Sequence, residues 1–571
     1  MSKYFSLITR WILSIFAFFL FFSCSKDADL LSEYVINTED NLQSIVLLAD
    51  DSFYMAPGQN SILMDVLNND NFSNPENVTI IETSTPSNGN VTINNDNTLT
   101  YTPVTEASNE ETTTEETVIE ETTPVSEDTF TYTAEVVDEE TGSTTKEEAT
   151  VTVTSSDLGE LLAFPGAVGF GKNTTGGRGG IVYHVTNLND SGSGSLRYGI
   201  ETLKGPRTIV FDVGGDIYLT GMQLNIGVSN GDLTIAGETA PFPGITIRGD
   251  NISSSSYGGT LDISASNVII RYISIRENNN KSTNNDGIRL RNDSGMSNII
   301  LDHVSVSHGS DENMSSKGAK NVTIQNCMIS NGLSVGTFLF SRENYDFSFV
   351  GNYMSHTGYR NILLGYGENE ENIEVINNIT YGYEEGLYIA YGHDTDILGN
   401  IYKSFPNNTP NYASIQWVQN LNSMSISDGN LYLQDNYQVN AHQYDLYNQN
   451  SITYKINNRA ITNSTILTWA STVQDIEARV FGDKLPGNSL YQDSMDEQAI
   501  ADYFNNTGDF GSLKVPSKES TSRSSDYDTD NDGIADAWER DVYGDLSKTA
   551  NGDEDGDGYT NLEAFLYSLV Q

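Results

Sequence analysis

A repeat of short β-rich segments is the feature that most constrains how this chain can fold. Six units begin at residues 267, 298, 321, 346, 372 and 394, and they read NVIIRYISIR, NIILDHVSVS, NVTIQNCMIS, DFSFVGNYMS, NIEVINNITY and DTDILGNIYK. The spacings of 31, 23, 25, 26 and 22 residues are typical of a solenoid. Each unit has the pattern of strands rather than of a helix pair. The repeat therefore predicts a mainly β fold built on a parallel β-helix, with Val and Ile inside and Asn residues stacked at the turns.

Net charge limits the partners that the chain can have. The 571 residues include 78 acidic and 29 basic ones, for a net charge of −49. Such a chain repels nucleic acid and anionic lipid surfaces, and it also repels acidic polysaccharide unless cations are held locally. The length suggests three or four domains. The only cysteines, Cys24 and Cys327, cannot form a disulfide framework, and Cys327 is expected to be a small buried side chain of a strand.

Residues 1–24 have the features of a lipoprotein signal peptide. Lys3 and Arg10 accompany the apolar run WILSIFAFFLFFSC, which ends at Cys24. A plain secretion signal and an uncleaved anchor helix are the alternatives. Cleavage before Cys24 would leave a lipidated cysteine that anchors the chain to outer-membrane lipid. We therefore expect a secreted, outer-membrane or cell-surface lipoprotein, with residues 25–44 as a linker.

Residues 45–156 are predicted to form a β-sandwich. Segments such as ILMDVLNNDN, NVTINNDNTLTYTP and DTFTYTAEVVD alternate apolar and polar residues, as half-buried strands do. In their order they resemble bacterial cadherin-like modules of the immunoglobulin type. The segment 106–128 contains nine acidic residues and no basic one, which predicts a disordered insert.

The charge balance changes between residues 271 and 360. This window holds nine Lys or Arg and eight Asp or Glu residues, so its net charge is +1 in a chain of −49. Because these charges fall on a few consecutive coils, many of them can share one face. Cations beside clustered carboxylates are what a calcium-assisted site for an acidic sugar needs.

Four motifs then carry a resemblance to a known family. In order, AFPGAVGFG, GGRGGIVYHVTNLNDSGSGSLR, DGIRLRNDSGMSNIILDHVSVSHGSDE and HTGYRN resemble landmarks of family 1 polysaccharide lyases, the pectate lyases. The resemblance implies a right-handed parallel β-helix over residues 163–515. It also implies calcium-dependent cleavage of pectate or a related uronate polymer by β-elimination. An acidic polysaccharide is then the expected partner, and the expected state is a monomer.

The resemblance also implies roles for individual residues. They are calcium ligands Asp286, Asp302 and Asp311, substrate-binding Lys317 and the catalytic base Arg360; Arg342 is expected to bind substrate as the cation near a position where the family lysine is missing. Three carboxylates from stacked coils could converge on one calcium ion. An ordinary guanidinium stays protonated, so an arginine base would need local positive charge and poor solvation to lower its pKa. The assignment of the base therefore rests on the resemblance.

The chain departs from the family pattern beside the expected base. Ile362 and Leu363 stand where the family carries a proline and a second arginine, and a lysine usual one coil earlier is missing. Substrate contacts are therefore altered. One alternative is a β-helix glycoside hydrolase of the polygalacturonase type, although its GHG and RIK motifs are absent. Another is a non-catalytic glycan-binding surface protein.

The C-terminal residues 526–571 contain two acidic loops. The first, DTDNDGIADAWE, has an acidic residue at positions 1, 3, 5, 9 and 12 and Gly533 at position 6, which is the complete EF-hand pattern. The second, DEDGDGYTNLEA, has Ala564 at position 12, so it is imperfect. We predict a calcium-binding helix–loop–helix module with the ligands Asp528, Asp530, Asp532, Asp536, Glu539, Asp553, Asp555 and Asp557.

Overall fold

The computed structural model describes most of the chain from residue 48 onward. The described residues are 48, 50–55, 61–67, 70, 77–103, 126–137, 143–155, 161–252, 258–277, 285–333, 336–340, 343–365, 372–390, 393–418, 429–440, 443–482 and 484–571. They all belong to one compact unit. The predicted signal peptide with Cys24, the linker, residues 106–125 of the acidic insert and Arg342 lie outside the described residues.

The N-terminal strands form two sheets. One has the order β1-β7-β6-β3 and the other β2-β5-β4. Buried Tyr101 and Phe130 come from different sheets and stack with ring centroids 6.5 Å apart, so the sheets face each other. The resemblance to cadherin-like modules stays a prediction. The strands are β1 (Asp51–Met55), β2 (Ile62–Met64), β3 (Val78–Thr83), β4 (Gly89–Ile93), β5 (Leu99–Pro103), β6 (Ser126–Val137) and β7 (Thr144–Ser155).

The acidic insert ends earlier than predicted. Ser126–Asp128 belong to β6. Asp128 is buried, and its carboxylate accepts hydrogen bonds from the Ser87 and Asn88 amides, both at 2.8 Å, and from the Tyr101 hydroxyl at 2.8 Å. An acidic residue with three donors can be held in a folded strand, which the one-sign charge of the segment did not indicate.

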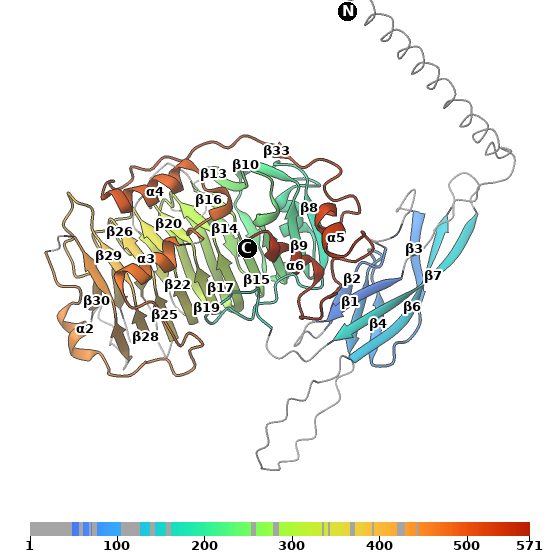
Figure 1. Cartoon of the computed structure of the whole chain (residues 1–571), viewed down its shortest axis with the longest axis horizontal. Helices are drawn as coiled ribbons and strands as arrows, with labels where there is room; N and C mark the ends of the chain where they lie inside the picture. The colour runs from blue at the N-terminus through green and yellow to red at the C-terminus, as the bar shows by residue number, and fades with distance from the viewer. Residues whose placement is uncertain are drawn as a thin grey trace, which may run out of the picture. The chain divides into compact units, whose positions relative to one another are not determined.

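The central part of the chain is the predicted parallel β-helix, whose coils form three faces of parallel strands (Figure 1). The first face consists of β11 (Leu224–Ile226), β14 (Gly258–Ile263), the first parts of β17 (Asn285–Asp302) and β19 (Glu312–Gln325), β21 (Gly336–Phe340), β24 (Leu363–Leu364), β27 (Leu387–Ala390) and β30 (Ile415–Val418).

The second face shares the two long strands β17 and β19. It consists of β8 (Ile181–Val185), β9 (Arg207–Phe211), β12 (Leu233–Ala236), β15 (Val268–Arg271), the last parts of β17 and β19, β22 (Tyr345–Val350), β25 (Asn372–Ile376), β28 (Asp394–Leu398) and β31 (Leu431–Gln434). The third consists of β10 (Val213–Gly221), β13 (Ile245–Ile252), β16 (Ser274–Arg276), β18 (Ser305–Ser307), β20 (Met328–Ser330), β23 (Tyr353–Ser355), β26 (Ile379–Tyr381), β29 (Ile401–Lys403) and β32 (Tyr437–Val439).

Left-handed turn residues explain why the repeat is visible in the sequence. Asn267, Asn298, Asn321 and Asp346 each begin a repeat and have φ values of 60°, 61°, 54° and 56°. Asn and Asp tolerate this conformation better than other non-glycine residues. The turn therefore selects the residue type that marks the period.

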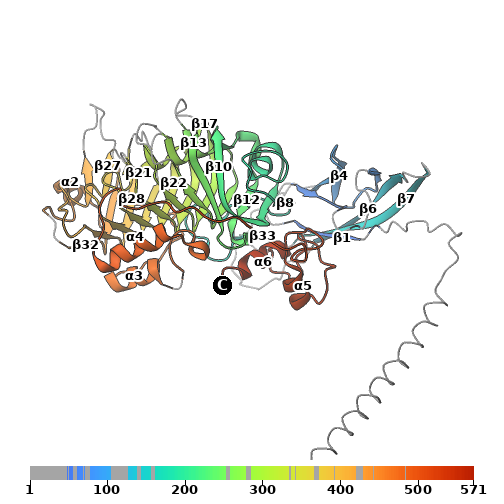
Figure 2. The ribbon, with the colours of Figure 1, turned by 90° about the horizontal axis from the view of Figure 1, so that it is seen from above.

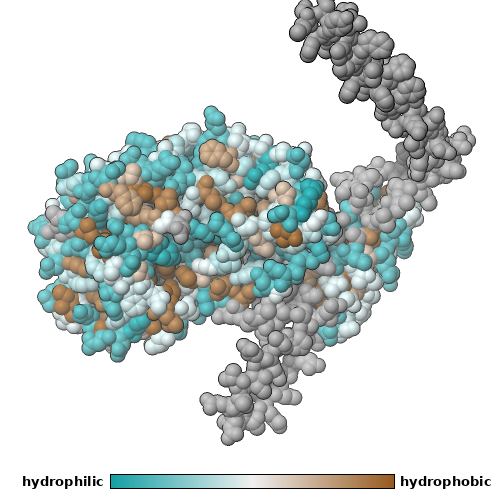
Figure 3. All heavy atoms as spheres, in the orientation of Figure 1, coloured by the Kyte–Doolittle hydropathy of each residue, from teal (hydrophilic) through white to brown (hydrophobic). Residues whose placement is uncertain are grey.

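Asparagines also form the predicted ladder inside the solenoid. The side-chain oxygens of Asn378, Asn400 and Asn436 accept hydrogen bonds from the backbone amides of Asn352, Asn378 and Asn400 at 2.8 to 3.1 Å. Asn352 in turn accepts from the amide of Cys327, which is fully buried as predicted. On the face in Figure 3, hydrophilic residues are spread between smaller hydrophobic patches, because most Val, Ile and Leu side chains of the repeats lie inside.

Short helices follow the last coil. They are α2 (Gln449–Tyr454), α3 (Val473–Phe481) and α4 (Ser494–Asn505). Figures 1 and 2 show α3 and α4 together on one side of the β-helix. There they pack on the third face through buried residues that include Met328, Tyr353, Ile476 and Met495. Within the described part of the chain, no helix has the length and apolar character that a membrane crossing requires.

The C-terminal module differs from the predicted helix–loop–helix order. Each acidic loop is followed by a helix, α5 (Asp536–Val542) or α6 (Asn561–Ser568), but residues 506–527, all described, contain no helix. The chain there runs along the solenoid instead: β33 (Thr521–Ser522) pairs with β10, and Arg523 donates a 2.8 Å hydrogen bond to the Thr239 carbonyl. The remaining short turns are η2 (Tyr198–Thr202), η3 (Val228–Asn230), η4 (Gly237–Thr239) and η5 (Ser489–Tyr491).

The asparagine ladder gives a first testable prediction. Asn378 accepts from the Asn352 amide at 2.9 Å and donates to the Phe349 carbonyl and to Asn400 at 2.9 and 3.0 Å. Asn378→Ala leaves these buried groups unpaired, so we expect the free energy of unfolding to fall by about 3 kcal/mol in urea denaturation. Asn411→Ala, which removes an exposed amide that bonds to Glu384, should change it by less than about 0.5 kcal/mol. Equal effects of the two substitutions would contradict the structural role of the ladder.

Candidate functional site

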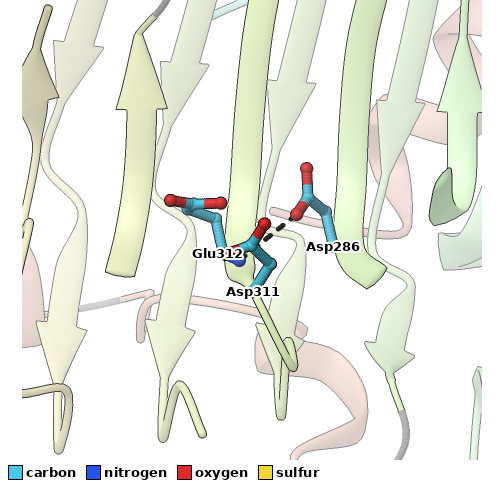
Figure 4. A group of neighbouring side chains, drawn as sticks. All are labelled: Asp286, Asp311 and Glu312. Atoms are coloured by element: carbon cyan, nitrogen blue, oxygen red, sulfur yellow. Dashed lines mark hydrogen bonds between the residues drawn. The ribbon is translucent and has the colours of Figure 1, made fainter. Parts of the chain in front are cut away.

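Three acidic side chains converge at one edge of the first face. Asp286 is the second residue of β17, Glu312 is the first residue of β19, and Asp311 directly precedes it. The parallel register that pairs Ile288 with Met314 brings the two strand beginnings side by side. Each residue offers a carboxylate oxygen within 4.8 Å of the others. Figure 4 shows the three side chains at the ends of neighbouring strands.

Burial makes the negative charge of these carboxylates energetically costly. Asp286 is 7% and Glu312 2% exposed. Burial, with a smaller contribution from neighbouring carboxylates, raises the pKa of Asp286 to about 7 and that of Glu312 to about 8. The Glu312 amide donates to Asp286 at 3.2 Å, and the Ser315 hydroxyl donates to the other Asp286 oxygen. Clustered oxygen donors whose charges repel one another fit a divalent cation of the calcium type.

Arg360 lies beside this carboxylate group. Its guanidinium is 2.5 Å from Glu312, and its side chain is 33% exposed. Its backbone carbonyl accepts hydrogen bonds from the Thr337 and Phe338 amides, both at 3.1 Å. Arg360 has a φ of 49°, and Ile362 has a φ of 141°, which is unusual for a β-branched residue. Strained backbone of this kind is found where a side chain must be held in a fixed place.

A basic cavity of about 360 Å³ adjoins the group on the same face. It is lined by Arg289, Arg291 and Lys317, and also by Ser315, which contacts Asp286. Lys317 donates to the exposed carboxylate of Asp293 at 2.6 Å, and Arg291 lies 3.8 Å from the same carboxylate. Among the described residues, the ion-pair partner of both cationic groups is the exposed Asp293, which a ligand carboxylate can replace.

Asp302 does not belong to the site, contrary to the prediction. It is the last residue of β17 and lies on the second face. Its carboxylate is buried and accepts hydrogen bonds from Arg271 at 3.1 Å, Gln325 at 2.9 Å and Asn326 at 3.0 Å. These donors connect Asp302 to the neighbouring coils of the second face and occupy its carboxylate.

Glu312 takes the place that the sequence had given to Asp302. The sequence showed it only as a neighbour of Asp311. Arg289 and Arg291 were counted as charges without a role, although their alternation on a predicted strand was the signal that they share a face. Arg342 lies outside the described residues, so its expected substrate contact stays a prediction.

The C-terminal acidic residues also gather into groups. Those of the first loop form two sets that share Asp530, with Asp528 and Asp536 in one and Asp532 and Glu539 in the other. The Asp536 carboxylate is partly engaged, because it accepts hydrogen bonds from Thr529 and Arg540. A third set comes from the second loop and comprises Asp553, Asp555 and Asp557.

Comparisons with known proteins agree with this geometry. No family model matches the chain. It is 33% identical over 439 residues to probable pectate lyase C of Aspergillus oryzae, and the aligned region covers 72% of this chain and 94% of that protein. It is 31% identical over 444 residues to probable pectate lyase C of Emericella nidulans, with coverages of 72% and 93%.

Two solved structures give TM-scores below 0.4. Pectate lyase II from Xanthomonas campestris pv. campestris has a TM-score of 0.35 at 16% identity, over 57% of this chain and 100% of that one. The major cedar-pollen allergen jun a 1 has a TM-score of 0.37 at 21% identity, over 50% of this chain and 87% of that one. The assignment rests on the sequence relatives, which are matched over nearly their whole length: this chain belongs to the pectate lyases and is a polysaccharide lyase.

Proposed function

We propose that this chain cleaves pectate or a related uronate polymer by β-elimination, with calcium bound by Asp286, Asp311 and Glu312 and with Arg360 as the base. The observation that carries the proposal is the placement of Arg360 against Glu312 at 2.5 Å, in a carboxylate group that suits a divalent cation. A hydrolase is not favoured, because the relatives are named as lyases.

The carboxylate group supplies the oxygen donors that calcium prefers. Calcium bound there would neutralise the uronate carboxylate and stabilise the negative charge that develops when the C5 proton leaves. Glu312 has a second task in this arrangement, because the same carboxylate orients the Arg360 guanidinium.

The basic cavity supports binding of an acidic polymer by a strongly acidic chain. Lys317 and Arg291 would exchange Asp293 for a carboxylate of the substrate. Arg289 is held by Asp262 at 3.0 and 2.6 Å, so it contributes a fixed positive charge. Arg342 is proposed as a further substrate contact from the sequence alone. These cations meet the expectation that positive charge is held locally where the sugar binds.

Elimination then needs no attacking water. Arg360 takes the C5 proton, the C5–H electron pair forms the C4–C5 double bond, and the bond from C4 to the glycosidic oxygen breaks. The departing oxygen receives a proton from solvent. The product therefore carries an unsaturated sugar at its new end, which absorbs ultraviolet light.

The proposed lipid anchor at Cys24 and the cell-surface location rest on the sequence. The residues concerned lie outside the described part of the chain. The N-terminal sandwich is proposed as a spacer between this anchor and the catalytic β-helix.

Substitution of Arg360 tests the base. Arg360→Ala should lower kcat by about 10²- to 10⁴-fold, the usual contribution of a positioned base, in an ultraviolet assay of product formation from polygalacturonate with saturating calcium. Arg360→Lys should fail similarly, since lysine does not reproduce the guanidinium geometry. Lys320→Ala, which removes an exposed lysine from the part of β19 that belongs to the second face, should keep full activity. Retention of kcat in Arg360→Ala would remove Arg360 from the role, and reducing ends without absorbance would indicate hydrolysis.

The calcium requirement should depend on pH. With pKa values of about 7 and about 8, Asp286 and Glu312 hold protons at low pH that calcium must displace. Protons therefore weaken calcium binding as the pH falls, and above about pH 8 both carboxyls are ionised. We expect the calcium concentration for half-maximal activity to rise at least about tenfold from pH 8.5 to pH 6. A requirement that stays constant over this range would contradict binding at these two carboxylates.

A further inference from the structure

The Asp528–Glu539 loop contains buried carboxylate oxygens without partners. Glu539 is 0% exposed, and neither of its oxygens has a hydrogen-bond partner in the part of the chain that the structure describes. Asp532 is 3% exposed, and its Oδ2 also lacks one. Oxygens of Asp530, Asp532 and Glu539 lie within 4.8 Å of one another. Unpaired buried carboxylates are costly, and a cation bound between these oxygens would offset that cost.

The kind of donor identifies the cation. All donors are oxygens, and Gly533 provides the sharp turn with a φ of 90°. Glu539 at the last position can bind through both oxygens, and Ile534 at position 7 contributes a backbone carbonyl in loops of this pattern. Magnesium demands a near-ideal octahedron and usually keeps several waters, whereas calcium takes six to eight oxygens in flexible geometry. The donor set therefore fits calcium.

The same loop packs on the first coils of the β-helix. Ile534 is fully buried in a cluster with Val210 and Ala236 of β9 and β12. A Cβ on Gly533 would lie 2.7 Å from Cγ1 of Val182 in β8, so the loop backbone touches that strand. The residue that offers a carbonyl at position 7 is thus also the residue that docks on the solenoid.

His184 of β8 contacts the backbone of the Asp528–Glu539 loop. Nε2 of His184 lies 3.1 Å from the Asn531 carbonyl and 3.7 Å from the Asp528 carboxylate. Its Nδ1 lies 3.2 Å from Asp212, which fixes the ring from the other side. The contact joins a coil of the β-helix to the first position of the acidic loop.

The second acidic loop, residues 553–564, is attached to the β-helix in a different way. Its aspartate oxygens accept hydrogen bonds from the loop's own amides, including those of Gly556 and Gly558 at 2.8 and 3.0 Å. Glu563, one place before the usual last ligand, instead binds buried Arg178 at 2.7 and 2.9 Å. Asn551 donates to the Gly180 carbonyl at 2.9 Å. This loop is attached to the solenoid by direct protein contacts and does not need an ion for that attachment.

We propose that the Asp528–Glu539 loop binds one calcium ion that holds the C-terminal module on the first coils of the β-helix, independently of the calcium in the catalytic cleft. The ion orders the loop, and the ordered loop covers β8, β9 and β12 with Gly533 and Ile534. Calcium thus stabilises the end of the solenoid at a distance from the reaction.

Three measurements on the full-length mature chain test this. In wild type, calcium added to the chelated protein should raise the melting midpoint by roughly 5 °C. It should also slow amide exchange of Ile181–Val185 and Arg207–Phe211 at least tenfold. Glu539→Gln should bind one calcium fewer by equilibrium dialysis and lose both effects, while it keeps lyase activity at saturating calcium. Asp532→Asn provides a second variant if Glu539→Gln does not fold.

Two matched controls separate this site from others. Glu554→Gln changes a partly exposed acidic residue of the second loop that pairs with Lys548, and it should behave as wild type in all three measurements. Asp286→Asn should lose lyase activity but keep the calcium effects on β8 and β9. The proposal is overturned if Glu539→Gln retains the wild-type stoichiometry and shifts. It is also overturned if the ion is lost without any change in exchange at β8 and β9.

Discussion

The parallel hydrogen-bond ladder between consecutive coils is the constraint on which the rest of the structure depends. It fixes neighbouring strands at about 4.8 Å, so side chains at matching positions cannot move apart. Asp286 and Glu312 come from adjacent coils of this ladder and are therefore held together despite like charge. Burial is the main cause of the raised pKa values of both groups, and for Glu312 the nearby Asp286 carboxylate adds to it. A scaffold of this rigidity can maintain an arrangement of carboxylates that a flexible loop would relax.

The carboxylates of Asp286, Asp311 and Glu312 differ from those of the Asp528–Glu539 loop in how easily a ligand can approach them. In the cleft, Arg360 is 33% exposed and a basic cavity adjoins the acids, so a ligand can approach. In the C-terminal loop, Glu539 is fully enclosed by protein. The first arrangement suits an ion that also contacts a substrate, and the second suits an ion that remains bound. An acidic chain can therefore use one kind of cation for two separate purposes.

The sequence predicted the β-helix because its turns select residue types. Left-handed positions such as Asn267 and Asn321 favour Asn, and this preference marks each coil. The site was predicted less completely, for a geometric reason. β17 runs through two faces, so Asp286 and Asp302 belong to one strand but to different surfaces. Periodicity identifies strands and their alternation, but it does not show where a long strand bends from one face to the next.

The C-terminal module shows a similar limit. The sequence showed the spacing of the predicted calcium ligands. It did not show that no helix precedes Asp528, because the preceding residues are held by contacts with a distant part of the chain. β33 attaches this segment to β10 through backbone groups, which carry no residue-type signal, and the Arg523 side chain adds a hydrogen bond to the Thr239 carbonyl.

The asparagine ladder has a consequence for how the protein can change in length. The side chains of Asn352, Asn378, Asn400 and Asn436 each accept a hydrogen bond from a backbone amide of the preceding coil, whatever that coil contains elsewhere. Duplication or deletion of a whole coil would preserve every step of the ladder, whereas insertion of one residue within a strand would break it. The solenoid can therefore gain or lose length in complete turns beyond the cleft, so that the extent of the surface can vary while the reacting groups stay in place.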